Sequence, residues 1–176
     1  MKLINIEKIK EAREKLNGII AYNRLAFAPR LSKIANAKVF LKKENLQLTG
    51  AFKIRGAFNK LSSLKQEDEK NGTNILNRGV ICSSAGNHAQ GVAFSSRHFG
   101  VRAVIVMPES TPLLKVSGTR EMGAEVVLAG NNYDEAYAEA LKIAKEQNLN
   151  FIHPFADTDV IAGQGTIALE MIEEEE

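Results

Sequence analysis

Hydrophobic positions in the N-terminal part of the chain predict two helices and one strand. A stripe at helical spacing lies between Asn5, a residue type that caps helices, and Gly18, which can end one. The segment 25–31 is expected to be a loop around a proline, whereas 38–43 alternates weakly and predicts a strand. A second stripe accompanies Lys53, and the polar stretch 65–74 beyond it is expected to be a solvated loop. The two stripes consist of Ile6, Ile9, Ala12, Arg13 and Leu16, and of Phe52, Ala57, Phe58, Leu61 and Leu64.

From residue 80 onward the pattern becomes regular, with short apolar runs alternating with helical stripes. The runs 80–83, 101–107, 125–128 and 151–152 predict strands. Helices are expected between them: one closed by Gly100, one opened by Thr111-Pro112, and one over 133–147. A last helix, capped by Asp159, is expected to run into four terminal glutamates that form a frayed, solvated end. Strands and helices that alternate with short connections are typical of parallel βαβ units, so the fold class is α/β.

Composition narrows the functional classes. The 176 residues are 44% hydrophobic and 25% charged, as in soluble globular proteins, and suffice for one good-sized domain or two small ones. A net charge of +2 without a basic stripe does not favour a nucleic-acid partner. We find neither a signal peptide nor a membrane-spanning run, and expect no membrane association. The single cysteine, Cys82, lies in an apolar run and suits a structural thiol in a reducing compartment, so we expect a cytoplasmic protein.

Two other motifs are expected to have structural roles. The histidines His88, His98 and His153 have no ligand-like spacing, so we expect no metal site. The run 163–168 fits the G-x-G-x-x-A dinucleotide pattern, but it falls inside a helical segment and no acidic residue follows at roughly 20 residues. We interpret its glycines as small residues that allow helices to pack closely.

Lys53 is the first candidate for chemistry. It follows the Thr49-Gly50 turn and an aromatic residue, where the helical stripe begins. The positive end of the helix dipole and burial both disfavour a charged amine, and a neutral amine can attack a carbonyl. A solvated lysine at a helix start is the alternative that the residues alone leave open.

The segment from Ser83 to Gly91 is the second candidate. A strand, a turn of small residues and a helix start together present free backbone N–H groups and the positive end of a dipole. This arrangement predicts a site for a carboxylate or phosphate, although it lacks the Lys-Ser pair of a Walker loop. A plain strand-to-helix turn is the alternative.

Both candidates resemble one family. The run from Lys43 to Ala57 is similar to the lysine signature of pyridoxal-phosphate (PLP) enzymes of fold type II, and within that group to threonine dehydratases. Ala51 stands where many relatives carry serine, and alanine is compatible with the turn. The segment from Ser83 to Gly91 resembles the asparagine loop of the same enzymes, and the last helix also matches them.

The resemblance implies a three-layer parallel-sheet fold of the tryptophan synthase β-like kind. It implies that residues 48–150 form a small lobe, and that 1–47 and 151–176 belong to a large lobe that is incomplete. It also implies PLP-dependent dehydration and deamination of L-threonine, and of L-serine, to a 2-oxo acid and ammonia. Lys53 would bind the cofactor covalently and remove the α-proton. The other implied site residues are Phe52 and Asn87 for the cofactor, and Ser83, Ser84, Ala85, Gly86, Asn87 and His88 for the substrate carboxylate.

The same resemblance places the glycine-rich loop for the cofactor phosphate downstream of the last helix. The sequence therefore resembles the N-terminal half of a dehydratase, and we expect these residues alone to bind PLP weakly, to be inactive and to self-associate. The intact enzyme is expected to be a homo-oligomer. Two alternatives stay open: a non-catalytic fragment, and another type II enzyme such as a serine racemase or a β-replacing synthase. In related racemases a serine at the position of Ala85 is the second acid–base, so alanine favours elimination.

Overall fold

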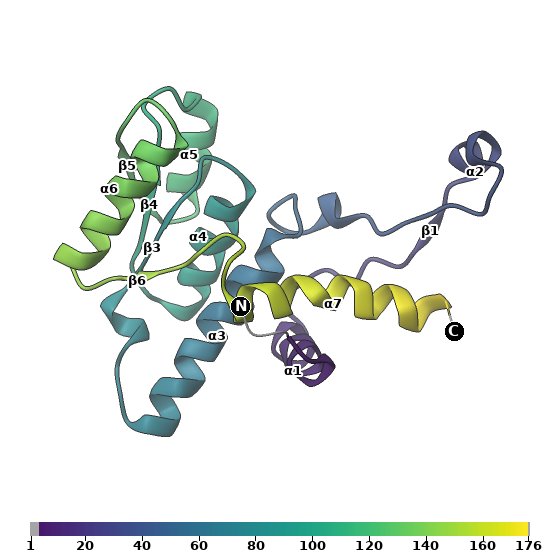
Figure 1. The fold of residues 1–176 in the computed structure, drawn as a ribbon, viewed down its shortest axis with the longest axis horizontal. Helices are drawn as coiled ribbons and strands as arrows, with labels where there is room; N and C mark the ends of the chain where they lie inside the picture. The colour runs from purple at the N-terminus through teal and green to yellow at the C-terminus, as the bar shows by residue number, and fades with distance from the viewer. Residues whose placement is uncertain (1–3, 176) are drawn as a thin grey trace.

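The computed structural model describes residues 4–175 and contains a four-stranded parallel sheet (Figure 1). The strand order is β5-β4-β3-β6, which brings β6 beside β3 although β4 and β5 lie between them in sequence. Val80 pairs with Ala103 and with Asn150, and the register continues in parallel. The strands are β3 (Val80–Ser83), β4 (Ala103–Met107), β5 (Glu125–Leu128) and β6 (Asn150–Phe151). The predicted βαβ rhythm is therefore confirmed.

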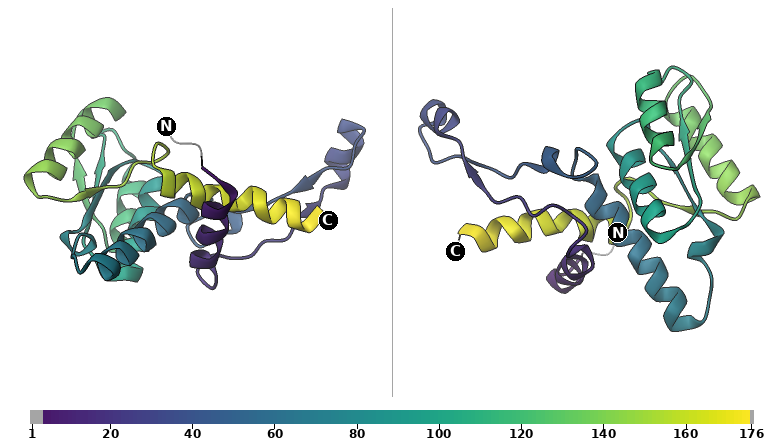
Figure 2. Two further views of the ribbon diagram at one scale, coloured as in Figure 1. Left: turned by 60° about the horizontal axis from the view of Figure 1, so that its bottom comes forward. Right: turned by 180° about the vertical axis from the view of Figure 1, so that it is seen from behind.

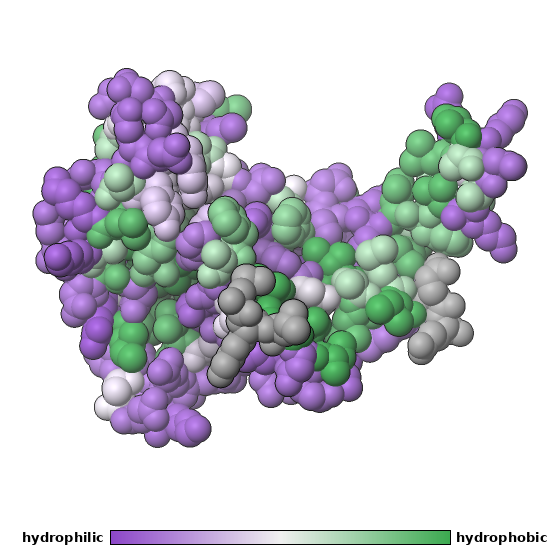
Figure 3. All heavy atoms as spheres, viewed as in Figure 1, coloured by the Kyte–Doolittle hydropathy of each residue, from purple (hydrophilic) through white to green (hydrophobic). Residues whose placement is uncertain are grey.

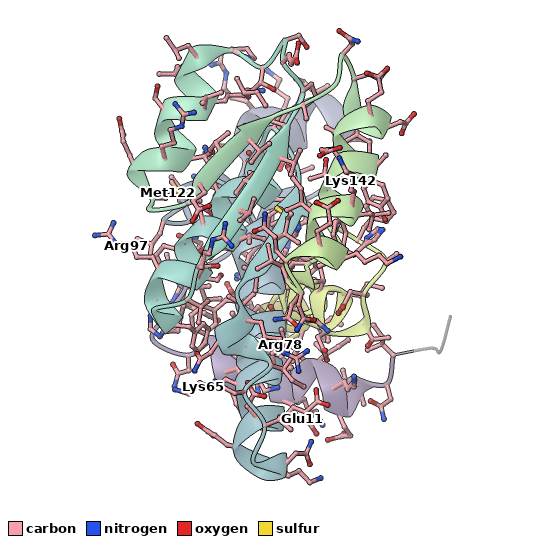
Figure 4. All side chains as sticks on the ribbon, turned by 90° about the vertical axis from the view of Figure 1, so that its left-hand side faces the viewer. Glu11, Lys65, Arg78, Arg97, Met122 and Lys142 are labelled. Carbon is pink, nitrogen blue, oxygen red and sulfur yellow. The ribbon has the colours of Figure 1, made fainter. Side chains whose placement is uncertain are left out.

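Helices cover both faces of this sheet and produce three layers. Alternate residues of β3 and β4 point into two separate buried clusters, because successive side chains of a strand face opposite ways. Val80, Cys82 and Ile105 lie in the cluster that packs against α3, α4 and α5, and Ile81 and Val104 lie in the cluster under α6. Figure 4 shows the strand arrows of the sheet between Met122, which follows α5, and Lys142 of α6. The helices are α3 (Lys53–Asn71), α4 (Asn87–Phe99), α5 (Leu113–Glu121) and α6 (Tyr133–Glu146).

A helical layer joins the sheet to the rest of the chain. Helix α7 (Thr158–Glu175) packs against α3 and against α1 (Ile6–Leu16), whose first turn is capped by Asn5 as expected. Gly56 on α3 and Gly163 on α7 let the helices touch, since a Cβ at Gly163 would lie 2.5 Å from the carbonyl oxygen of Arg55. A Cβ at Gly165 would likewise lie 3.0 Å from the side chain of Ile9 on α1, so the interpretation of Gly163 and Gly165 as packing residues is confirmed.

The segment that lies between α1 and α3 in the sequence forms an arm that projects from the body (Figures 1 and 2). It contains β1 (Ala26–Phe27), α2 (Pro29–Ala35) and β2 (Phe40–Leu41), and returns through the short 3₁₀ helix η1 (Glu44–Leu46). The expectation of a loop at 25–31 is wrong, because Pro29 starts a helix at a position where its missing N–H costs nothing. Figure 3 shows apolar side chains gathered on the arm, where Ile34 is 82% exposed.

Three boundary expectations are also wrong. Helix α3 continues through the polar stretch to Asn71 because Gly72 (φ 65°) ends it, and a second 3₁₀ helix, η2 (Leu76–Arg78), follows. Asp157 rather than Asp159 caps α7, since its carboxylate accepts the N–H groups of Asp159 and Val160. Pro112 was expected in the first turn of its helix with Thr111 as the cap, but it precedes α5 as the cap residue, without a capping side chain.

The glutamates at the end of α7 are not simply solvated. Glu173 pairs with Arg13, and Glu174 accepts hydrogen bonds from Lys42 (2.8 Å) and from the N–H of Leu25 (2.6 Å). Glu176 lies outside the described residues. Within residues 4–175, no helix has both the length and the apolarity to cross a membrane. The division into lobes stays a prediction, and β6 spans its expected boundary at residue 150.

Candidate functional site

Lys53 is the first residue of α3, as the hydrophobic spacing predicts. Its side chain is half-buried, and burial lowers the pKa of the amine. The Nζ atom donates a hydrogen bond to the carbonyl oxygen of Pro154 (2.8 Å) and lies 5.3 Å from the centroid of the Phe52 ring. A carbonyl oxygen is a weaker partner for an ammonium group than a carboxylate, so the neutral amine is reached more easily here than on the surface.

The turn after β3 leads into the N-terminus of α4, whose second residue, His88, is close enough to Lys53 for the charge of the amine to lower its pKa. The strand ends at Ser83 and α4 begins at Asn87, without a capping side chain and without an acidic residue in the first turn. The first N–H groups of the helix and its positive dipole end are therefore free of an internal anion. A Cβ at Gly91 would lie 3.0 Å from the carbonyl oxygen of Lys53, so the first turns of α3 and α4 are in contact.

The six residues of this turn differ in exposure. Ser83 is fully buried, Ser84, Ala85 and Gly86 are half-buried, and Asn87 is exposed. The hydroxyl of Ser84 accepts the N–H of Gly86 (3.3 Å), which tightens the turn. The structure thus brings together Lys53, Phe52 and the turn from Ser83 to His88, whereas their roles toward a ligand stay predictions.

His88 has a buried side chain that is directed away from the turn. Its Nε2 lies 3.0 Å from the carbonyl oxygen of Ile152, so Nε2 carries the proton and donates it. Burial lowers the pKa of His88 to about 4, against a smaller opposing effect of this hydrogen bond, and the charge of Lys53 lowers it further. Because Nε2 is engaged with Ile152, Nδ1 and the backbone N–H of His88 remain for a ligand.

The pKa of His88 predicts how stability depends on pH. Because the pKa of His88 is lower in the folded protein, the unfolded chain takes up this proton at a higher pH than the folded protein does. The free energy of unfolding is therefore highest above the ordinary pKa near 6.5 and falls as the pH decreases toward about 4. The loss should be on the order of 3 kcal/mol. Urea unfolding at about pH 7 and about pH 4 should show a smaller decrease for His88→Gln, which keeps a donor but does not titrate. Equal decreases in both proteins would contradict this.

The segment 152–156 after β6 completes the site and was not found from the sequence. His153 Nδ1 accepts the N–H groups of Phe155 (3.2 Å) and Ala156 (2.8 Å), which fixes the turn that carries the carbonyl of Pro154. A signal was available, because this segment follows a parallel strand and ligands bind at the carboxyl ends of such strands. Within the described residues no group of three or more metal-binding side chains occurs. His88 and His153 are instead engaged by backbone groups of Ile152, Phe155 and Ala156.

These residues fit a cofactor that carries an aldehyde and anionic groups. The amine of Lys53 has a lowered pKa, as attack on a carbonyl requires. The hydroxyl of Ser83 and Nδ1 of His88 are buried without a protein partner beside the free helix end. Cys82 in the same strand is not a competing nucleophile, since complete burial raises the pKa of its thiol.

A family model described as "Pyridoxal-phosphate dependent enzyme" matches residues 16–176. The chain belongs to this family. Pyridoxal phosphate is the cofactor of its members, which agrees with the fit above. The predicted fold class, an α/β fold of the type II pyridoxal-phosphate enzymes, is confirmed by similar solved structures.

The similar proteins include several threonine-converting enzymes. L-threonine ammonia-lyase of Thermotoga maritima is 49% identical over 172 residues, 98% of this chain and 41% of that protein. The biosynthetic L-threonine dehydratase IlvA of Bacillus subtilis is 39% identical and covers 97% of this chain and 39% of its own length.

Two solved structures share the fold closely. Threonine deaminase isoform 2 of Solanum lycopersicum has a TM-score of 0.83 at 36% identity, covering 96% of this chain and 46% of its own. Maize serine racemase has a TM-score of 0.88 at 29% identity, covering 98% and 50%. The chain therefore spans half or less of the length of these four proteins.

Proposed function

We propose that the protein containing this chain converts L-threonine, and also L-serine, to a 2-oxo acid and ammonia. The observation that carries the proposal is the half-buried Lys53 amine beside the free N-terminus of α4, in a chain 49% identical to an L-threonine ammonia-lyase over nearly its whole length. Bound pyridoxal phosphate supplies the electron sink for this chemistry. The net reaction releases one ammonia per substrate and no water, because the water lost with the β-hydroxyl is taken up again when the product is hydrolysed.

Different residues of the chain have different roles in this reaction. Lys53 binds the cofactor covalently, and its amine accepts the α-proton of the substrate. Phe52, with its ring beside Nζ, would pack against the cofactor, and Asn87 would form a hydrogen bond with the hydroxyl of the cofactor ring. The backbone N–H groups of the turn from Ser83 to His88 hold the substrate carboxylate, as the dipole of α4 favours.

Ala85 supports elimination over racemisation. Inverting Cα requires a second acid–base on the face opposite the lysine, because a proton removed from one face must return to the other. Ala85 has no exchangeable proton, and its half-buried methyl group packs against the core cluster. The structural similarity to maize serine racemase makes racemisation the second candidate.

Replacing Ala85 by serine should therefore introduce racemisation. With L-serine as substrate, the natural protein is expected to give pyruvate with little D-serine, whereas Ala85→Ser should give D-serine as a measurable second product. Chiral chromatography resolves the two outcomes, and Ala85→Gly is the control that changes size without adding a hydroxyl. Appreciable D-serine from the natural protein would contradict the assignment.

The function itself is tested with the full-length protein, L-threonine and added cofactor. We expect stoichiometric 2-oxobutanoate and ammonia, detected by a keto-acid assay. D-allothreonine, formed by inversion of Cα alone, or a β-substituted product would replace the proposal by a racemase or synthase, and absence of both cofactor absorbance and product would favour the non-catalytic alternative.

The organisation of the whole protein also belongs to this proposal. Residues 48–150 would form one wall of the cofactor cleft as the small lobe, with 1–47 and 151–176 in the other lobe. The exposed apolar side chains of the arm are consistent with burial against further protein and with a homo-oligomer.

A further inference from the structure

Arg55, two residues after Lys53, has every N–H of its guanidinium group in a hydrogen bond. The group has five N–H donors in a planar fork. Nε and Nη2 donate to both carboxylate oxygens of Glu44 (2.8 Å each), and Nη1 and Nη2 donate to both oxygens of Glu170 (2.5 and 2.9 Å). The fifth bond goes to the hydroxyl of Thr166 (3.0 Å). Arg55 is 0% exposed, so the geometry is fixed by buried partners.

The partners of Arg55 come from two segments far apart in the sequence. Glu44 lies in η1, just before the Thr49-Gly50 turn, and also accepts a hydrogen bond from Gln47 (3.2 Å). Glu170 lies on α7 and forms a second buried ion pair with Lys42 (3.0 Å). The guanidinium group thus joins the return of the arm, the first turn of α3 and the middle of α7. A lysine could not replace it, since an ammonium group has three donors and no fork.

The first turn of α3 needs such a connection because it has no cap. Phe52 precedes the helix without a capping side chain, and the first turn contains no acidic residue. An uncapped helix start frays readily. On one side Gly91 of α4 touches the backbone of Lys53. On the other side Gly56 packs against α7, and Arg55 is the residue of this turn whose side chain forms hydrogen bonds with α7.

We propose that Arg55 is the positioning residue of the site: its forks to Glu44 and Glu170 hold the first turn of α3, so that the amine of Lys53 stays in place beside the turn from Ser83 to His88. The proposal deepens the proposed function, because it concerns the same amine. Arg55 acts through the backbone of α3 and does not itself contact the reacting atoms.

The action of Arg55 on Lys53 is geometric rather than electrostatic. Burial would lower the pKa of Arg55, but its hydrogen bonds to Glu44 and Glu170 outweigh this effect and raise that pKa, so the group stays charged. Its positive charge is balanced by those two carboxylates at 2.5 to 2.9 Å. The lowered pKa of Lys53 comes from burial, with no contribution from Arg55. Loosening the first turn should therefore raise the pKa of Lys53, because water would then reach the amine.

Arg55→Lys in the full-length protein tests this, because it keeps the charge and removes the forks. The pKa of Lys53 is measured by acetylation of the cofactor-free protein across a pH series, followed by peptide mass spectrometry, which needs no turnover. We expect the pKa of Lys53 to rise toward its ordinary value. With L-threonine, kcat should fall on the order of tenfold with KM nearly unchanged, because a displaced reacting group lowers the rate of the bound complex.

Two further variants keep the test decisive. Glu44→Gln removes one fork and should raise the pKa of Lys53 by a smaller amount, which decides the question if Arg55→Lys does not fold. Lys60→Met breaks the ion pairs of Lys60 with Asp157 (2.8 Å) and Asp159 (3.3 Å), which also join α3 to the start of α7, and should leave the pKa of Lys53 unchanged. An unchanged pKa in the folded Arg55 and Glu44 variants, or an equal rise in Lys60→Met, would overturn the proposal. A missing threonine activity would not affect the acetylation result.

Discussion

Lys53→Ala is expected to abolish covalent binding of pyridoxal phosphate and to lower turnover of L-threonine at least about 10²–10⁴-fold. That range is what a single acid–base group contributes, and the loss of covalent cofactor binding adds to it. The structure gives the reason: the amine is half-buried, has a lowered pKa and lies beside the free N-terminus of α4. Absorbance of the lysine-bound cofactor and a keto-acid assay measure the two effects.

A matched control is Lys115→Ala, which removes an exposed lysine from α5. It should keep both the absorbance band and the activity. Full activity in Lys53→Ala would show that another amine binds the cofactor.

Gly163→Ala is expected to lower the free energy of unfolding by about 3 kcal/mol, the upper range for overpacking a core. The added Cβ would lie 2.5 Å from the carbonyl oxygen of Arg55 and 2.7 Å from Cα of Gly56. Both are backbone atoms, so relief requires α3 and α7 to separate, which also strains the forks of Arg55. Urea or thermal unfolding gives the change directly.

Gly118→Ala is the control for this substitution. Gly118 lies inside α5 with no atom within 4 Å of the added Cβ, so alanine should stabilise the protein by about 0.5–1 kcal/mol. If both substitutions changed stability in the same direction and by similar amounts, close packing of α3 on α7 would not be the reason.

Local sequence patterns predicted the parts of the site that depend on local structure. Lys53 at a helix start and the small-residue turn after Val80–Ser83 follow from periodicity and from the residue types at element boundaries. The glycines of the last helix were interpreted correctly because a dinucleotide loop would have to follow a strand directly.

The parts that were missed depend on contacts between distant residues. Arg55 meets Glu44 and Glu170 across 11 and 115 positions, and no local pattern marks such a pair. The terminal glutamates were interpreted as solvated for the same reason, although Glu174 reaches back to Lys42. The segment around Pro154 contributes a backbone carbonyl, which any residue type supplies, so its identity carried little information.

The central claim, that Lys53 is the residue that binds pyridoxal phosphate, is tested most directly by labelling. The full-length protein is incubated with the cofactor and treated with borohydride, which makes the link to the lysine permanent, and the labelled peptide is then identified by mass spectrometry. The account predicts a single label on Lys53, in the peptide that also contains Phe52. A label on another lysine, such as Lys42 or Lys60, would contradict it.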